Sequence, residues 1–118
     1  TFAYDTSANA DKAEREQLAA KRLFGLLPED QAAYLRRLWD EYEEQQTPES
    51  KFANAVDRMQ PAMLNHLAGD ESPWKRHGVS VPQAMKRLSP IGDGATVLWE
   101  HTQVIIQEAH ERGHLKPE

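Results

Sequence analysis

The residue whose type and setting most favour chemistry is Asp57, in the stretch KFANAVDRMQPAMLNHL at residues 51–67. Apolar residues recur there at the spacing of one helix face. They are Phe52, Val56, Met59, Met63 and Leu67. A helix places Asp57 about 100° round from Val56, beside this apolar stripe. Ionised acids are rarely buried unless they are paired or bound to metal. Two interpretations follow: a metal-ligating or base carboxylate, or a half-exposed acid paired with Lys51 or Arg58.

Pro61 follows Asp57 by four residues and changes the helix at that point. Proline has no N–H, so it leaves the carbonyl of Asp57 without its usual helical hydrogen bond and favours a kink. The start of the helix is indicated by Thr47-Pro48-Glu49, because a hydroxyl cap, a proline and an acid suit the first turn. Gly69 is expected to end it.

A second candidate is the acidic run of residues 40–44, DEYEE. Four acids at the C-terminal end of a helix oppose the helix dipole. Such runs are commonly a solvated face. The alternative is that Glu41 faces the same site as Asp57, because a short turn joins the two helices. Glu41 is therefore a candidate member of the same site as Asp57.

Other motifs do not complete a site. None of the five histidines forms a His-Asp or H-E-x-x-H pattern, so most are expected at the surface, with His66 packed or capping and His114 at a frayed helix end. A metal site usually needs three convergent ligands. We find no nucleophile elbow, P-loop or dinucleotide fingerprint, and we assign no catalytic residue in this chain. Trp74 lies in a basic loop. Its ring either stacks on a nucleotide base or packs against the edge of the hydrophobic core.

Composition narrows the class of protein. At 118 residues, 39% hydrophobic and 28% charged, the sequence predicts one soluble domain with a modest core. The net charge of -5 disfavours nucleic acid as a partner, since phosphate binding needs clustered cations. The absence of cysteine suits a reducing cytoplasm. No apolar run approaches the roughly 18 residues of a membrane span.

The whole pattern predicts an all-α fold of four or five helices without strands. Residues 70–79 are expected to form a loop and residues 89–94 a turn. The expected core includes Phe24, Trp39, Phe52 and Trp99, and the alternative for any of them is a surface that faces a partner copy. The expected helices start between residues 7 and 11 and run to 27, then span 29–46, 48–68, 81–88 and 95–112.

Four segments together are similar to a known family. They are TFAYDTSANADKAEREQLAAKRLFGLLP, LWDEYEEQQTPESKFANAVDRMQP, PWKRHGVSVPQ and LWEHTQVIIQEA. They resemble the C-terminal two-thirds of HD-domain phosphohydrolases of the 5'-deoxynucleotidase type. The resemblance covers essentially the whole chain, and residues 39–61 are its most specific part.

The resemblance implies an all-α bundle, usually a homodimer, that binds one divalent metal ion. In that family the ligands are a histidine, a His-Asp doublet and a later helical aspartate, and Asp57 in NAVDRMQP matches the last of these. The implied reaction is the water-driven removal of the 5'-phosphate from a (deoxy)nucleoside monophosphate. A divalent ion suits that reaction because it lowers the pKa of bound water.

The departure from the family is large, because its first histidine, His-Asp doublet and adjacent acids precede the segment that TFAYD matches. We therefore expect residues 1–118 to be the C-terminal portion of a single HD-type helical domain, with Thr1 a start within a longer protein. The chain alone is expected to be inactive. The rival hypothesis is a non-catalytic all-α interaction module that has kept the scaffold and is indifferent to chelators.

Overall fold

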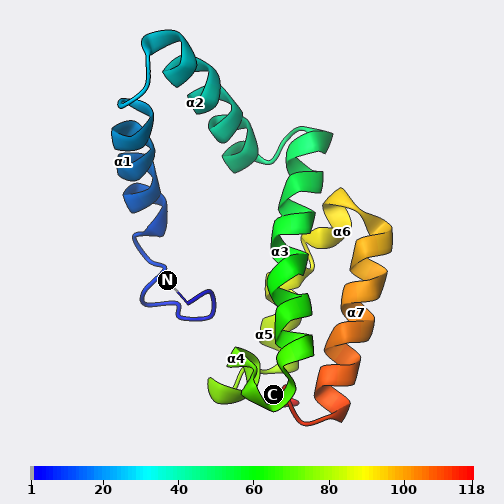
Figure 1. Ribbon diagram of the computed structural model, residues 1–118. Helices are drawn as coiled ribbons and strands as arrows, with labels where there is room; N and C mark the ends of the chain where they lie inside the picture. Colours follow the sequence, from blue (N-terminus) through cyan, green and yellow to red (C-terminus); the bar gives the residue numbers. More distant parts are fainter. Residues whose placement is uncertain (1) are drawn as a thin grey trace. The chain divides into compact units, whose positions relative to one another are not determined.

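The computed structural model describes residues 2–118, which are mainly helical and contain no strand beyond an isolated bridge between Ser80 and Lys116. Thr1, where a start within a longer protein was predicted, lies outside the described residues. Five helices of at least eight residues confirm the all-α prediction. They are α1 (Lys12–Phe24), α2 (Glu29–Glu44), α3 (Pro48–Ala68), α5 (Val81–Leu88) and α7 (Thr96–Glu111) (Figure 1). Within residues 2–118, none of the helices combines the length and apolarity needed to cross a bilayer.

The chain divides into two compact units, which are described separately. The N-terminal unit comprises Thr1–Glu44 and the C-terminal unit Gln45–Glu118. A single HD-type domain over residues 1–118 stays a prediction.

The N-terminal unit is a pair of helices joined around Pro28. The rings of Phe24 and Trp39 meet edge to face with their centroids 6.5 Å apart. Arg36 Nη2 donates to Gln17 Oε1 at 2.6 Å, a polar bond between α2 and α1. Phe24 and Trp39, which were expected in the core, are half-buried.

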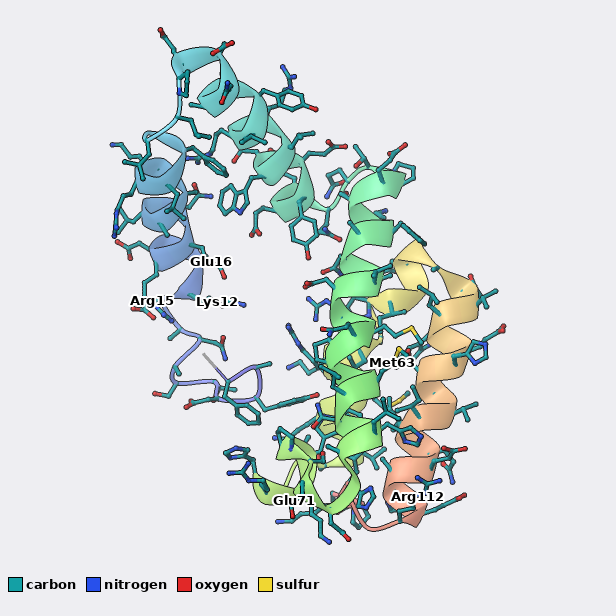
Figure 2. All side chains as sticks on the ribbon, in the orientation of Figure 1. Lys12, Arg15, Glu16, Met63, Glu71 and Arg112 are labelled. Carbon is teal, nitrogen blue, oxygen red and sulfur yellow. The ribbon has the colours of Figure 1, made fainter. Side chains whose placement is uncertain are left out.

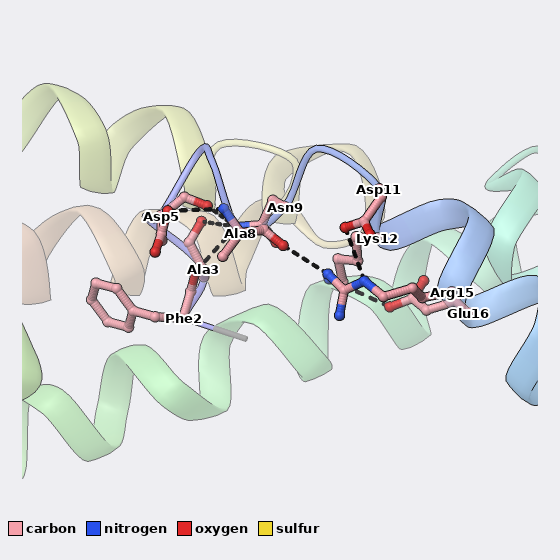
Figure 3. A network of polar contacts seen from close by, with 9 residues as sticks. All are labelled: Phe2, Ala3, Asp5, Ala8, Asn9, Asp11, Lys12, Arg15 and Glu16. Atoms are coloured by element: carbon pink, nitrogen blue, oxygen red, sulfur yellow. Dashed lines mark hydrogen bonds and ion pairs between the residues drawn. The ribbon is translucent and has the colours of Figure 1, made fainter.

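A network of polar contacts orders the residues before α1 (Figure 3). Asn9 Nδ2 donates to the carbonyl oxygens of Phe2 and Asp5, at 3.1 and 2.6 Å. Arg15, in the first turn of α1, reaches back and donates from Nη2 to the Ala8 carbonyl at 2.7 Å. The segment therefore satisfies its own carbonyl groups through side-chain amide and guanidinium donors.

The ends of α3 follow the capping signals in the sequence. Thr47 is extended, and its Oγ1 accepts a hydrogen bond from the Ser50 amide at 3.2 Å. Pro48 occupies the first turn, where its missing N–H costs nothing. At the other end Gly69 has a φ of +57°, which glycine adopts without strain. The predicted bounds of this helix are confirmed.

In the C-terminal unit, α3 and α7 run side by side with α5 beside them (Figure 1). The short helix α6 (Ile91–Gly94) packs closely against α3 and precedes α7. The buried apolar residues of this unit are Ala55, Ala62, Trp74, Val79, Ala84, Leu88, Ile91, Ile106, Ala109 and Leu115.

The predicted inward face of α3 is wrong. Most of the large apolar side chains of the stripe, and Leu64 beside them, are exposed (Met63 is labelled in Figure 2). Their exposed fractions are Phe52 53%, Val56 47%, Met63 45%, Leu64 55% and Leu67 77%. The buried row instead passes through Ala55 and Ala62, which are 0% and 1% exposed. Near the start of this helix, α6 approaches the α3 backbone closely, because Gly94 lies against Lys51 and Phe52.

The loop predicted over residues 70–79 and the turn predicted over 89–94 contain short helices. The first holds a 3-10 turn, Gly69–Glu71, and α4 (Pro73–Arg76), and the second holds α6. Ser72 caps α4 by accepting the Trp74 amide at 3.0 Å. Trp74 is 2% exposed, so its interpretation as a core plug is confirmed and base stacking is wrong.

Ser80 is expected to contribute measurably to stability through its capping box at the start of α5. Its Oγ accepts the Gln83 amide at 3.3 Å, while Gln83 Oε1 accepts the Ser80 amide at 2.9 Å. We expect Ser80→Ala to lower the free energy of unfolding by about 1 kcal/mol in urea titrations. Ser89→Ala, at an exposed serine after the same helix, is the matched control and should change it by less. Equal losses would contradict the capping account.

Candidate functional site

Asp57 lies in the middle of α3 with its side chain exposed. By helical geometry it is about 200° from Ala55 and about 140° from Ala62, so it points away from the buried alanine row. It borders the α3 apolar surface, defined here as Phe52, Val56, Met63, Leu64 and Leu67. The carboxylate is therefore accessible from outside the described residues, beside apolar side chains.

The helical turn that follows Asp57 lacks one backbone hydrogen-bond donor. Pro61 lies inside α3 and carries no N–H, so it cannot donate to the Asp57 carbonyl. The helix nevertheless continues to Ala68. Asn65 Nδ2 donates to the Pro61 carbonyl at 2.8 Å, which adds a side-chain bond within the next turn.

Arg58 connects this part of α3 to α5. Its Nη1 donates to the Arg87 carbonyl oxygen at 2.7 Å, and its Nε donates to Asn54 Oδ1 at 3.2 Å. Arg87 is in the last turn of α5, whose carbonyl groups carry partial negative charge. Sequence reasoning considered Arg58 only as a partner of Asp57 and missed the bond to α5.

Glu41, the other predicted site residue, is half-buried in α2 and belongs to the N-terminal unit. Asp57 belongs to the C-terminal unit, so the prediction that both face one site stays a prediction. In the acidic run, partial desolvation raises the pKa of Glu43, and the nearby negative charge of Glu16 raises it further.

Two histidines lie close to carboxylates at the far end of α3. His66 Nε2 is 3.2 Å from Glu108 Oε2 on α7, and His114 Nε2 is 3.6 Å from Asp70 Oδ1. A hydrogen bond from Lys75 is the main cause of the lowered pKa of Asp70, with a smaller contribution from His114.

His114, which was expected at a frayed helix end, is instead buried, with only 8% of its surface exposed. Gly113, with a φ of +76°, turns the chain after α7. The Lys116 amide then bonds to the Val79 carbonyl at 3.0 Å. The returning segment buries Leu115 together with His114.

The donors available in the described chain do not make a complete metal site. Within residues 2–118, no three histidine, aspartate or glutamate side chains form a group that could hold an ion. Asp57 offers one exposed carboxylate, whereas a stable site usually needs three or more protein ligands. Residues 2–118 therefore do not fit a divalent ion by themselves.

Comparisons with known proteins identify relatives over most of the chain. A solved structure from Magnetospirillum magnetotacticum, of a predicted metal-dependent phosphohydrolase, is 44% identical with a TM-score of 0.90 and covers 99% of this chain. Among curated proteins, the 5'-deoxynucleotidase HDDC2 of Bos taurus is 43% identical over 54 residues, or 46% of this chain. The Mus musculus protein of the same name is 41% identical over 54 residues, also 46% of this chain.

All of these relatives are longer than the part that matches. The match spans 58% of the solved relative and 26% and 27% of the two curated ones. The family described as HD domain matches residues 1–99, which is most of the sequence. The chain therefore belongs to the HD-domain family.

Proposed function

We propose that this chain is part of a metal-dependent phosphohydrolase that removes the 5'-phosphate of (deoxy)nucleoside monophosphates, with Asp57 as one metal ligand. Membership of the HD-domain family supports the class of enzyme. The 5'-deoxynucleotidase relatives support the substrate class. The observation that carries the proposal for Asp57 is its exposed carboxylate in the middle of α3.

In this proposal the remaining metal ligands come from outside residues 2–118, since the described donors do not complete a site. We therefore assign no reaction step to these residues. Glu41 is proposed as a substrate contact. Assembly as a homodimer rests on the resemblance, and a cytoplasmic location is supported by the absence of cysteine. The net charge of -5 supports a protein that does not bind nucleic acid.

Removal of metal is the test of this proposal. We expect the full-length protein with Mn²⁺ to release phosphate from deoxyadenosine 5'-monophosphate, because a divalent ion activates water for such hydrolysis. A chelator should reduce release to background, and added Mn²⁺ should restore it. The matched control is deoxyadenosine 3'-monophosphate, from which the protein should release no phosphate above background.

The rival interaction module predicts the opposite result. Such a protein releases no phosphate with any divalent ion, and its melting temperature is unchanged by chelator. That outcome would contradict the proposed function.

A further inference from the structure

The helix pair of the N-terminal unit has very little core of its own. Within the described residues 2–44, Ala20 is the only buried residue, with 5% of its surface exposed. The rings of Phe24 and Trp39, which join the two helices, are still half-buried. A unit of about 40 residues rarely encloses enough apolar surface to be stable alone, and such units are commonly stabilised by association. We therefore expect this pair of helices to pack against a further surface.

One face of the helix pair is apolar. Leu23 and Leu38 each come one residue before a ring that joins the helices, Phe24 and Trp39 respectively. Because α1 and α2 run antiparallel (Figure 1), one step back along either helix turns the side chain about 100° toward the same face of the pair. Leu35 and Tyr42 join this face, three residues before Leu38 and four after it.

These four side chains, Leu23, Leu35, Leu38 and Tyr42, are here called the hairpin apolar surface. Three of them are exposed, Leu23 to 57%, Leu35 to 39% and Leu38 to 43%, and Tyr42 is half-buried. An apolar stripe on a helix that is not covered is costly in water, so this surface favours contact with another apolar surface.

The charges of the two helices are complementary. Four cations and two acids lie on α1, whereas two cations and six acids lie on α2. The cations of α1 lie toward both of its ends, at 12, 15, 21 and 22, and the acids of α2 also lie at both ends, at 29, 30, 40, 41, 43 and 44.

This charge pattern selects one arrangement of two copies. A twofold axis parallel to the helices would place α1 of each copy on α2 of the other, so that opposite charges meet at both ends. An axis across the helices would instead place α2 on α2, where acids would meet acids. The hairpin apolar surface would be covered in both arrangements, but only the first also pairs the charges.

We propose that a second copy of this chain docks on the hairpin apolar surface, and that the two helix pairs form a four-helix bundle with α1 of each copy against α2 of its partner. Bundles of four helices are held together by apolar stripes of this kind, turned inward from every helix. The inference deepens the homodimer of the proposed function by naming its contact surface. It rests on neither a bound metal ion nor enzymatic activity.

The first test is the mass of the full-length protein by sedimentation equilibrium at micromolar concentration, which should be that of a dimer. Leu35→Glu combined with Leu38→Glu places carboxylates in the apolar contact and should raise the dimer dissociation constant more than about 100-fold. The matched control is Leu18→Glu, at a leucine of α1 that is 63% exposed and about 140° round the helix from Leu23. Its dimer should be unaffected. Circular dichroism should show unchanged helix content in both variants.

A pair of charge variants tests which helices meet. One carries Lys21→Glu and Arg22→Glu on α1, and the other carries Glu29→Lys and Asp30→Lys on α2. All four side chains are exposed, so the fold should persist. Each variant alone brings like charges together across the interface. A mixture should form heterodimers about tenfold more tightly than either homodimer, because both contacts then pair opposite charges again.

The outcomes separate this inference from the proposed function. A full-length protein that is monomeric overturns the inference, because the surface would then be covered within one chain. A dimer that survives Leu35→Glu with Leu38→Glu, or that Leu18→Glu weakens equally, also overturns it. Where the paired glutamate variant does not fold, the charge variants carry the comparison, and a mixture without preference for heterodimers contradicts the arrangement. A dimer that behaves as expected but releases no phosphate refutes the proposed activity alone.

Discussion

Asp57→Ala is expected to lower metal-dependent phosphate release by the full-length protein more than about 100-fold, beyond what the loss of a residue that only orients a ligand costs. Asp57 is exposed, so its removal leaves no cavity in the core. The folded structure should therefore persist, and the melting temperature without metal should change little. The measurement is release of inorganic phosphate from deoxyadenosine 5'-monophosphate at saturating Mn²⁺.

Asp93→Ala is the matched control for this prediction. Asp93 is another exposed aspartate of the C-terminal unit, on the short helix α6. Its replacement removes the same charge and the same atoms, so general electrostatic effects on an anionic substrate should be similar. Full activity in Asp93→Ala and loss in Asp57→Ala would support the assignment. If Asp57→Ala kept its activity and its metal content, Asp57 would not be a ligand.

Gly94→Ala is expected to lower the free energy of unfolding by about 3 kcal/mol, at the upper end of the range for overpacked sites. A Cβ atom at Gly94 would lie 2.1 Å from the Lys51 carbonyl oxygen, 2.5 Å from the carbonyl carbon and 2.9 Å from the Phe52 amide nitrogen. All three are backbone atoms of α3, so no side chain can rotate to make room. The short helix α6 would have to separate from α3.

Gly92→Ala provides the control within the same helix. Its new Cβ would lie 3.2 Å from Trp99 Cδ1, on a side chain that can shift by a few tenths of an ångström. The preference of helices for alanine over glycine, about 1 kcal/mol, offsets part of this strain. Urea unfolding should therefore show a small change for Gly92→Ala and a large one for Gly94→Ala. Similar midpoints for the two variants would contradict the close packing of α6 on α3.

The longer helices could be predicted because their signals are local. The hydroxyl groups of Thr47 and Ser80 accept amides three residues later, which mark where α3 and α5 begin. The one-turn helices α4 and α6 could not be predicted in this way. A helix of four residues is too short to be stable by itself and depends on caps and tertiary packing, such as the burial of Trp74 and Ile91.

The packing of α3 shows why helical periodicity did not identify its buried face. Periodicity locates large apolar residues, and the α3 apolar surface satisfies it fully. The face used within the described residues is instead the row of Ala55 and Ala62. One constraint on this packing is the close approach of α6, whose Gly94 lies against the α3 backbone at Lys51 and Phe52. That constraint joins residues some 40 positions apart in the sequence and has no local signal.

The candidate site was predictable in part. The type of Asp57, its place in a helix and the interruption at Pro61 are all visible in the sequence. The role of Asp57 as a metal ligand comes from the family resemblance. The bond of Arg58 to the Arg87 carbonyl could not be predicted, because it depends on how α5 packs against α3. A weak signal existed in the position of Arg58 between two alanines at helical spacing.

The central claim is that Asp57 binds a divalent ion, and crystals of the full-length protein grown with Mn²⁺ test it most directly. Anomalous scattering at the manganese edge locates the ion independently of any activity. We predict an anomalous peak about 2.1 Å from an Asp57 carboxylate oxygen, the ordinary length of a bond between such an ion and oxygen. An anomalous peak bound by other residues, with Asp57 in contact only with solvent, would contradict the account.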